Sequence, residues 1–176
     1  MPDYDIITPR LGLRNWTKND AVAYHVLCND SEVMRYFPFL LSMNQVNDFI
    51  VRMQRGYSKN GYCYFAADLI ETGQFIGFIG ISYQDFESDY TPNVDIGWRL
   101  SREHWNKGLA TEGAQACLDA AKDNWNIDTV YSFASLANEG SIRVMQKIGM
   151  KQVGTFVHPK IIDYPAISEC VVYKNI

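Results

Sequence analysis

A turn that breaks at glycine and runs into a helix of small residues has the clearest chemistry in this sequence. It reads REHWNKGLATEGAQ and spans residues 102–115. Gly108 lets the backbone turn without steric cost, and Thr111 can donate a hydroxyl. The first amides of a helix have no partner inside it and lie at the positive end of the helix dipole, so they attract anions. Lys107 adds a formal charge, and a phosphate or pyrophosphate is the natural ligand.

The alternative for this turn is structural, a glycine that opens a helix without a ligand. The sequence lacks two common nucleotide signatures, GxxxxGK(S/T) and GxGxxG after a strand. We therefore expect neither a P-loop nor a dinucleotide-binding fold. The expected anion-binding residues surround the start of the helix: Asn106, Lys107, Gly108, Leu109, Ala110 and Thr111.

Alternation and helical spacing place this turn between a strand over residues 93–100 and a helix that ends at about Trp125. Apolar or small side chains share one face of that helix: Ala110, Ala114, Cys117, Leu118, Ala121 and Trp125. Over the whole chain we expect one strand, two helices, three strands, a helix, a strand, a helix and two strands. This order predicts an α/β (α+β) fold with a mixed sheet of about seven strands and helices on both faces.

Two spacings mark the starts of the first two helices. Thr17 with Asp20, and Ser42 with Gln45, have the pattern of capping boxes. The segment DYDIITPRLGLR, residues 3–14, is expected to form a single opening strand.

Length and charge limit the classes of function. The 176 residues suit one domain, residues 1–176, and the 16 basic and 20 acidic residues give a net charge of −4. Binding to nucleic acid without sequence preference needs a basic surface, so no nucleic-acid partner is expected. No apolar stretch is long enough to span a membrane, and the four cysteines are far apart with no CxxC pair. We expect a soluble cytoplasmic protein without a membrane partner, a disulfide or a metal.

Two separate blocks carry a resemblance to a known family. DIGWRLSREHWNKGLATEGAQACLD, residues 95–119, resembles the acetyl-CoA-binding segment of the GNAT acetyltransferase superfamily, in its RimJ/RimL-like branch. The family's pyrophosphate loop has the form (Q/R)-x-x-G-x-(G/A), which falls here on residues 105–110 with Trp105 at its first position. ANEGSIRVMQKIGMKQVG, residues 137–154, is similar to a second family segment, and ITPRLGLRNWTKNDA, residues 7–21, to a third.

The resemblance implies a GNAT fold in which acetyl-CoA lies between two parallel strands that splay apart, residues 93–100 and 128–135. Main-chain groups of three residues are expected to bind the pantetheine arm: Trp98, Arg99 and Leu100. The amides of residues 106–111 would hold the pyrophosphate. Asn138 would bind the arm, or cap the helix that follows it, or do both.

The implied reaction is direct attack of a neutral amine on the thioester, which needs a base, an oxyanion donor and a proton for the thiolate. Ser141 is the expected acid, since the tyrosine that many family members place on this helix is absent; its alternative is hydrogen bonding at the helix start. Asp95 is the expected base, with a surface or substrate-orienting carboxylate as the alternative. A backbone N–H near the end of strand 93–100 would serve the oxyanion. Glu112 is better explained by the helix dipole.

The acceptor side is expected to lie between residues 35–42 and 84–93. Four residues are candidates for substrate binding, with packing as the alternative for the aromatic ones: Tyr36, Phe37, Tyr83 and His158. The acceptor is a protein N-terminus or a small amine, and a homodimer is one expectation for the assembly. The competing function is a CoA-binding sensor or partner module without catalysis. A phosphopeptide- or nucleotide-binding domain is a third interpretation.

Overall fold

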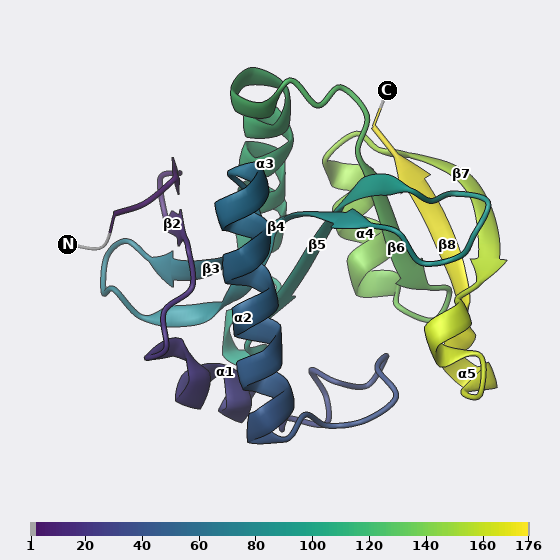
Figure 1. Ribbon diagram of the computed structural model, residues 1–176, viewed down its shortest axis with the longest axis horizontal. Coiled ribbons are helices and arrows are strands. Elements are labelled where there is room, and N and C mark those ends of the chain that lie inside the picture. The colour runs from purple at the N-terminus through teal and green to yellow at the C-terminus, as the bar shows by residue number, and fades with distance from the viewer. Residues whose placement is uncertain (1–2, 176) are drawn as a thin grey trace.

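The computed structural model describes residues 3–175. Within these residues, an eight-stranded sheet has the order β1-β2-β3-β4-β5-β6-β8-β7. The strands are β1 (Ile6–Ile7), β2 (Leu11–Arg14), β3 (Tyr64–Leu69), β4 (Phe75–Gln84), β5 (Asn93–Leu100), β6 (Tyr131–Ser135), β7 (Lys151–Val157) and β8 (Glu169–Lys174). Only β5 and β6 are parallel neighbours, and the other neighbours are antiparallel. The predicted mixed sheet with a parallel pair is confirmed (Figure 1).

The predicted single opening strand is wrong in one respect, because it folds back as a hairpin. Ile6 pairs with Leu13, and the turn closes with a hydrogen bond from the Thr8 amide to the Leu11 carbonyl, 2.9 Å. Pro9 lies in this turn, where its missing N–H and fixed φ favour a break in the strand. The sheet therefore has eight strands rather than about seven.

The helices begin close to the predicted positions. They are α1 (Asp20–Cys28), α2 (Met43–Asn60), α3 (Leu109–Trp125), α4 (Glu139–Lys147) and α5 (Pro165–Ser168), with short 3-10 helices at Arg102–His104 and Pro159–Ile161. The capping box of Ser42 and Gln45 is present. At α1 only half of the second box forms, since Asp20 accepts the Thr17 amide at 2.7 Å but no side chain caps the helix.

Helices cover both faces of the left part of the sheet in Figure 1. Neighbouring residues of β4 prove it, because successive side chains of a strand point to opposite faces. The ring of Phe78 lies 5.6 Å from Phe49 of α2. A Cβ added to Gly113 of α3 would meet Ile79 at 2.5 Å. The α1–α2 face and the α3 face are thus distinct, and Gly113 lets α3 lie very close to the sheet, as its small residues predicted.

The other part of the sheet carries α4, which contacts β6 and α3. The β4–β5 loop (residues 85–92) is anchored on this part by Phe86, whose ring stacks on Phe156 of β7 at 6.1 Å and on His158 at 4.5 Å. The two parts of the sheet meet at β5 and β6 (Figure 1). None of the described helices is long and apolar enough to cross a membrane.

Candidate functional site

The parallel strands β5 and β6 touch at one point and then separate. Their only paired residues within residues 3–175 are Asp95 and Tyr131. Next to this pair the Ser132 hydroxyl donates to the Ile96 carbonyl, 2.9 Å, in the last hydrogen bond between the two strands. β5 leads into α3 and β6 leads into α4, so the strands form a V whose open end faces the N-termini of both helices. We call this feature the β5–β6 V.

One stretch of main chain faces the gap of the V. The Ile96 carbonyl points toward β6, because it accepts the Ser132 hydroxyl. Backbone groups alternate in direction along a strand, so Trp98 also directs its N–H and C=O toward the gap. The peptide groups of Arg99 instead point toward Phe78 of β4, its register partner. Of the three residues expected to offer main-chain groups, Trp98 therefore has the best position, and the Leu100 carbonyl already accepts the Trp105 indole N–H at 2.8 Å.

The turn before α3 has the backbone of an anion site. Asn106 and Gly108 have positive φ values of 58° and 77°. Such alternation of left-handed residues gathers successive N–H groups into a concave nest that holds anions. No side chain caps α3, so the amides of Leu109, Ala110 and Thr111 have no capping acceptor. The exposed Lys107 adds positive charge at this point.

Arg10, in the β1–β2 turn, fixes the direction of this loop. Its Nη1 donates to the Lys107 carbonyl at 2.9 Å, and its Nη2 lies 2.6 Å from Glu112 Oε2. In a trans peptide the C=O and the N–H point in opposite directions. The bond to the Lys107 carbonyl therefore turns the Gly108 N–H away from Arg10. Glu112 also accepts the Thr8 hydroxyl at 2.6 Å, so this carboxylate joins α3 to the hairpin.

The other arm of the V ends in a capped helix. Asn138 Oδ1 accepts the Ser141 amide at 3.1 Å, which confirms its capping role. This bond leaves Asn138 Nδ2 without a hydrogen bond to any described residue, so it can still donate to a ligand. Ser141 is half-buried in the first turn of α4. Only its main chain takes part in the cap, which leaves its hydroxyl available.

Asp95 is a buried carboxyl group at the point where the V closes. Its residue is 8% exposed, and Oδ1 accepts the Tyr64 hydroxyl at 2.6 Å and Gln84 Nε2 at 3.0 Å. Burial raises the pKa of Asp95 to about 6, although both hydrogen bonds oppose this shift. Burial also raises the pKa of Tyr64, with the Asp95 charge as the next cause. A carboxyl group with a pKa near 6 can act as a base at neutral pH.

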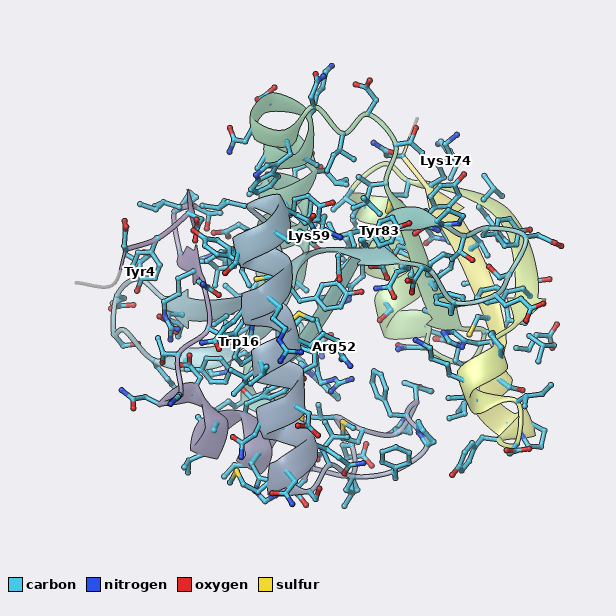
Figure 2. All side chains as sticks on the ribbon, in the orientation of Figure 1. Tyr4, Trp16, Arg52, Lys59, Tyr83 and Lys174 are labelled. Atoms are coloured by element: carbon cyan, nitrogen blue, oxygen red, sulfur yellow. The ribbon has the colours of Figure 1, made fainter. Side chains whose placement is uncertain are left out.

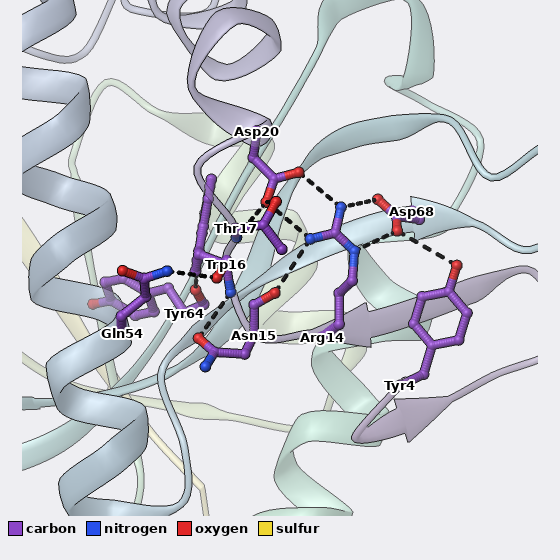
Figure 3. A network of polar contacts seen from close by, with 9 residues as sticks. All are labelled: Tyr4, Arg14, Asn15, Trp16, Thr17, Asp20, Gln54, Tyr64 and Asp68. Atoms are coloured by element: carbon purple, nitrogen blue, oxygen red, sulfur yellow. Dashed lines mark hydrogen bonds and ion pairs between the residues drawn. The ribbon is translucent and has the colours of Figure 1, made fainter. Parts of the chain in front are cut away.

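A chain of hydrogen bonds holds Tyr64 from behind (Figure 3). Its carbonyl accepts the Trp16 indole N–H at 2.5 Å, and the Trp16 carbonyl accepts Gln54 Nε2 of α2 at 2.8 Å. The same figure shows Arg14 bound to two carboxylates, Asp20 at 2.8 Å and Asp68 at 2.7 Å. This network joins β2, β3, α1 and α2 beside the strand that carries Tyr64.

The four residues expected at the acceptor side do not all lie together. Phe37 covers the side chain of Arg99, with the guanidinium carbon 3.9 Å from the ring centre. Tyr36 lies beside Arg35 in the same segment. Tyr83, labelled in Figure 2, alternates with Gln84 and so belongs to the α3 face, opposite to Asp95.

His158 has a local role in the structure. Its Nδ1 accepts the Lys160 amide at 3.2 Å, and its ring stacks on Phe86 at 4.5 Å. Burial lowers the pKa of His158, and the charge of Lys160 lowers it further. The ring is therefore neutral at neutral pH. Across residues 3–175, no group of three or more His, Cys, Asp or Glu side chains is arranged to hold a metal ion.

Comparison with known proteins decides the family. A family model described as Acetyltransferase (GNAT) domain matches residues 10–151. The chain belongs to this family. The match includes the β5–β6 V, the loop before α3 and all of α4, and it makes the protein a GNAT acetyltransferase.

Relatives agree along most of the chain. YkkB of Bacillus subtilis is 33% identical over 146 residues, which cover 82% of this chain and 84% of YkkB. YnaD of Bacillus subtilis, named an uncharacterized N-acetyltransferase, is 32% identical over 86% of this chain and 85% of its own length. The crystal structure of a GNAT-family acetyltransferase from Bacillus anthracis superposes with a TM-score of 0.78 and 25% identity, covering 97% of each chain.

Sequence analysis of this GNAT acetyltransferase did not single out Tyr64, Gln84 or Arg10. Tyr64 and Gln84 reach Asp95 from other strands, and Arg10 is 97 residues from the carbonyl that it binds. Such contacts leave no local pattern in the sequence. The alternation of β3 and β4 hinted only that Tyr64 and Gln84 lie on some face of a sheet.

Proposed function

We propose that this GNAT acetyltransferase transfers an acetyl group from acetyl-CoA to a primary amine. The observation that carries the proposal is the single Asp95–Tyr131 pair, which opens the β5–β6 V toward two helix N-termini and leaves a buried carboxyl group at its closed end. The name of YnaD, an N-acetyltransferase, supports nitrogen as the acceptor atom. The RimJ/RimL-like branch, a protein N-terminus or a small amine as acceptor, and a homodimer remain predictions.

The donor side fits acetyl-CoA, which supplies the thioester. The uncapped amides of residues 109–111, together with the left-handed Asn106 and Gly108, would bind the pyrophosphate. The exposed Lys107 would lie beside it. Trp98 would offer its main-chain N–H and C=O to the pantetheine arm, as a strand does to a neighbour.

Three groups of this chain can do the chemistry. Asp95 would take a proton from the attacking amine, directly or through water, because its pKa of about 6 leaves it ionised at neutral pH. The Trp98 N–H would stabilise the negative charge that develops on the carbonyl oxygen. The Ser141 hydroxyl, at the start of α4, would donate a proton to the departing sulfur.

The test is thiol release from acetyl-CoA, measured against a panel of small amines and N-terminal peptides. We expect release that depends on an amine and is reduced at least tenfold in Asp95→Asn. Asp48→Asn, an exposed aspartate of α2, is the matched control and should behave like the wild type. If the protein binds CoA but releases thiol with no amine, it is a CoA-binding module and the proposal fails.

A further inference from the structure

The side chain of Arg99 holds a partly buried positive charge that has no acidic partner among the described residues. Its Nη1 donates to the Tyr24 hydroxyl at 3.1 Å and approaches Cys28 Sγ at 3.5 Å. Its Nε is buried and has no hydrogen-bond partner. The guanidinium carbon lies 3.9 Å from the ring centre of Phe37 and 5.6 Å from that of Phe78. Everything that contacts this charge is therefore neutral or aromatic.

Other arginines of the structure with low exposure are satisfied differently. The side chain of Arg14 is 12% exposed and pairs with both Asp20 and Asp68. Taking a charge out of water is costly unless it is paired, and aromatic faces return only part of that cost. Arg99 keeps its charge without a carboxylate, so a counter-ion from outside the chain would complete its surroundings.

Arg99 also lies in the row that leads to Asp95. Residues 95, 97 and 99 of β5 point to the same face of the sheet, because their register partners in β4 are Ser82, Gly80 and Phe78. Gly97 has no side chain, so nothing from β5 separates the guanidinium from the carboxyl group. Four residues at about 3.3 Å each put the two Cα atoms roughly 13 Å apart, a span that two inward-leaning side chains shorten. Phe37 covers the Arg99 end of this row.

We propose that Arg99 binds an oxyanion of the acceptor, so that the substrates are amines that carry a carboxylate or a phosphate several bonds from the nitrogen. The inference rests on the proposed function, since it places the amine at Asp95. Arg99 suits this role because a guanidinium binds a carboxylate or a phosphate through parallel N–H groups. Its Nη2 has no hydrogen bond to any residue that the structure describes, and its Nη1 partners are neutral and can be exchanged.

Three acceptors of similar length test the proposal: aminohexanoate, aminohexanamide and aminohexyl phosphate. In the wild type we expect kcat/KM to be at least about tenfold higher for an anionic acceptor than for the amide, in line with a charge-assisted hydrogen bond. Arg99→Gln should abolish this preference and leave kcat/KM for the amide nearly unchanged. Arg99→Lys should retain part of it. The ratio of carboxylate to phosphate in the wild type tells which oxyanion is preferred.

Arg52→Gln is the matched control. Arg52 also lies over a ring of the same aromatic cluster, with its guanidinium carbon 5.4 Å from the centre of Phe49, but it is exposed on α2 (Figure 2). This variant should keep the preference. An equal loss of preference in both variants would mean that general positive charge is responsible, and would overturn the role of Arg99.

A binding measurement separates this inference from the proposed function. Calorimetry of acetamidohexanoate and acetamidohexanamide, in the presence of CoA, needs no turnover. Tighter binding of the carboxylate to the wild type than to Arg99→Gln supports the inference. Equal binding of the two compounds, or weaker CoA binding by Arg99→Gln, overturns it. Thiol release with neutral amines would in that case leave the proposed function standing.

Discussion

Arg10 and Lys107 are 97 residues apart in sequence, yet Arg10 Nη1 donates to the Lys107 carbonyl at 2.9 Å. This contact couples the first hairpin to the loop proposed to bind pyrophosphate. Because it fixes one peptide plane, it also fixes the direction of the Gly108 N–H. Arg10 is thus a positioning residue, which acts on an anion through the main chain of another residue.

Arg10→Ala should weaken CoA binding by about tenfold, as expected when one aligned donor of an anion site is lost. The change should appear in KM for acetyl-CoA more than in kcat. Arg10→Lys should rescue little, because an ammonium cannot reach the Lys107 carbonyl and Glu112 with the same fork. Arg143→Ala removes a comparable arginine from an exposed pair with Glu139 and should leave CoA binding intact. Unchanged CoA affinity in Arg10→Ala would refute the positioning role.

The buried Asp95 predicts a pH dependence of activity. A base must be ionised, so kcat/KM should rise with pH and reach its half-maximum near pH 6, the pKa of this group. Asp95→Asn keeps an oxygen for the hydrogen bonds from Tyr64 and Gln84 but cannot take a proton. We expect its kcat/KM to fall by about 10²–10⁴-fold and to lose the inflection near pH 6. A pH profile of thiol release is the measurement.

The same group predicts a pH dependence of stability. Its folded pKa of about 6 is above the ordinary 3.8, so the folded protein holds this proton more tightly than the unfolded chain does. The stabilisation is complete below the unfolded pKa and is lost as pH rises through about 6. Over that window the stability of Asp95→Asn relative to the wild type should rise by up to roughly 3 kcal/mol. Urea unfolding at several pH values tests this, and a constant difference would contradict it.

Tyr64→Phe should shift the inflection of activity upward. The Tyr64 hydroxyl donates to Asp95 and favours its ionised form, so losing it should raise the inflection by about one pH unit. Tyr57→Phe is the control, because the Tyr57 hydroxyl donates to Asp5 at the same 2.6 Å, far from Asp95 in the chain. Its pH profile should match the wild type. A parallel shift in both variants would exclude a specific effect of Tyr64.

Asp68 provides a contrast between a carboxylate for stability and one for chemistry. It is 1% exposed, like Asp95 it is buried, but it pairs with Arg14 (Figure 3). Asp68→Asn leaves Arg14 with less compensation and should lower the free energy of unfolding by up to about 3–5 kcal/mol. The kcat of the folded fraction should stay near the wild-type value. Denaturant unfolding together with active-site titration separates the two effects.

Ser141 and Asn138 can be tested as a pair. Ser141→Ala removes only the hydroxyl, since the cap uses the Ser141 amide, so stability should hold while kcat falls by about tenfold or more. Asn138→Ala removes the cap and should cost about 1 kcal/mol of stability. Full activity in Ser141→Ala would leave Ser141 with no part in proton transfer.

The sequence by itself determined the elements that carry the site. A glycine before a run of small residues predicted the loop and α3, and strand β5 was predicted with its observed bounds. These features are local, because backbone freedom at glycine, periodicity and free amides at a helix start depend on neighbours in the chain. The capping alternative for Asn138 was of the same kind and is present.

Only the tertiary structure decided what surrounds each group. The raised pKa of Asp95 comes from burial and from partners on β3 and β4, and the lone charge of Arg99 is defined by Tyr24, Cys28 and Phe37. Tyr83 was expected at the acceptor side, but the alternation of β4 directs it to the opposite face from Asp95. Solvation and charge pairing depend on segments that are distant in sequence, so they follow from the packing of the sheet and not from any local pattern.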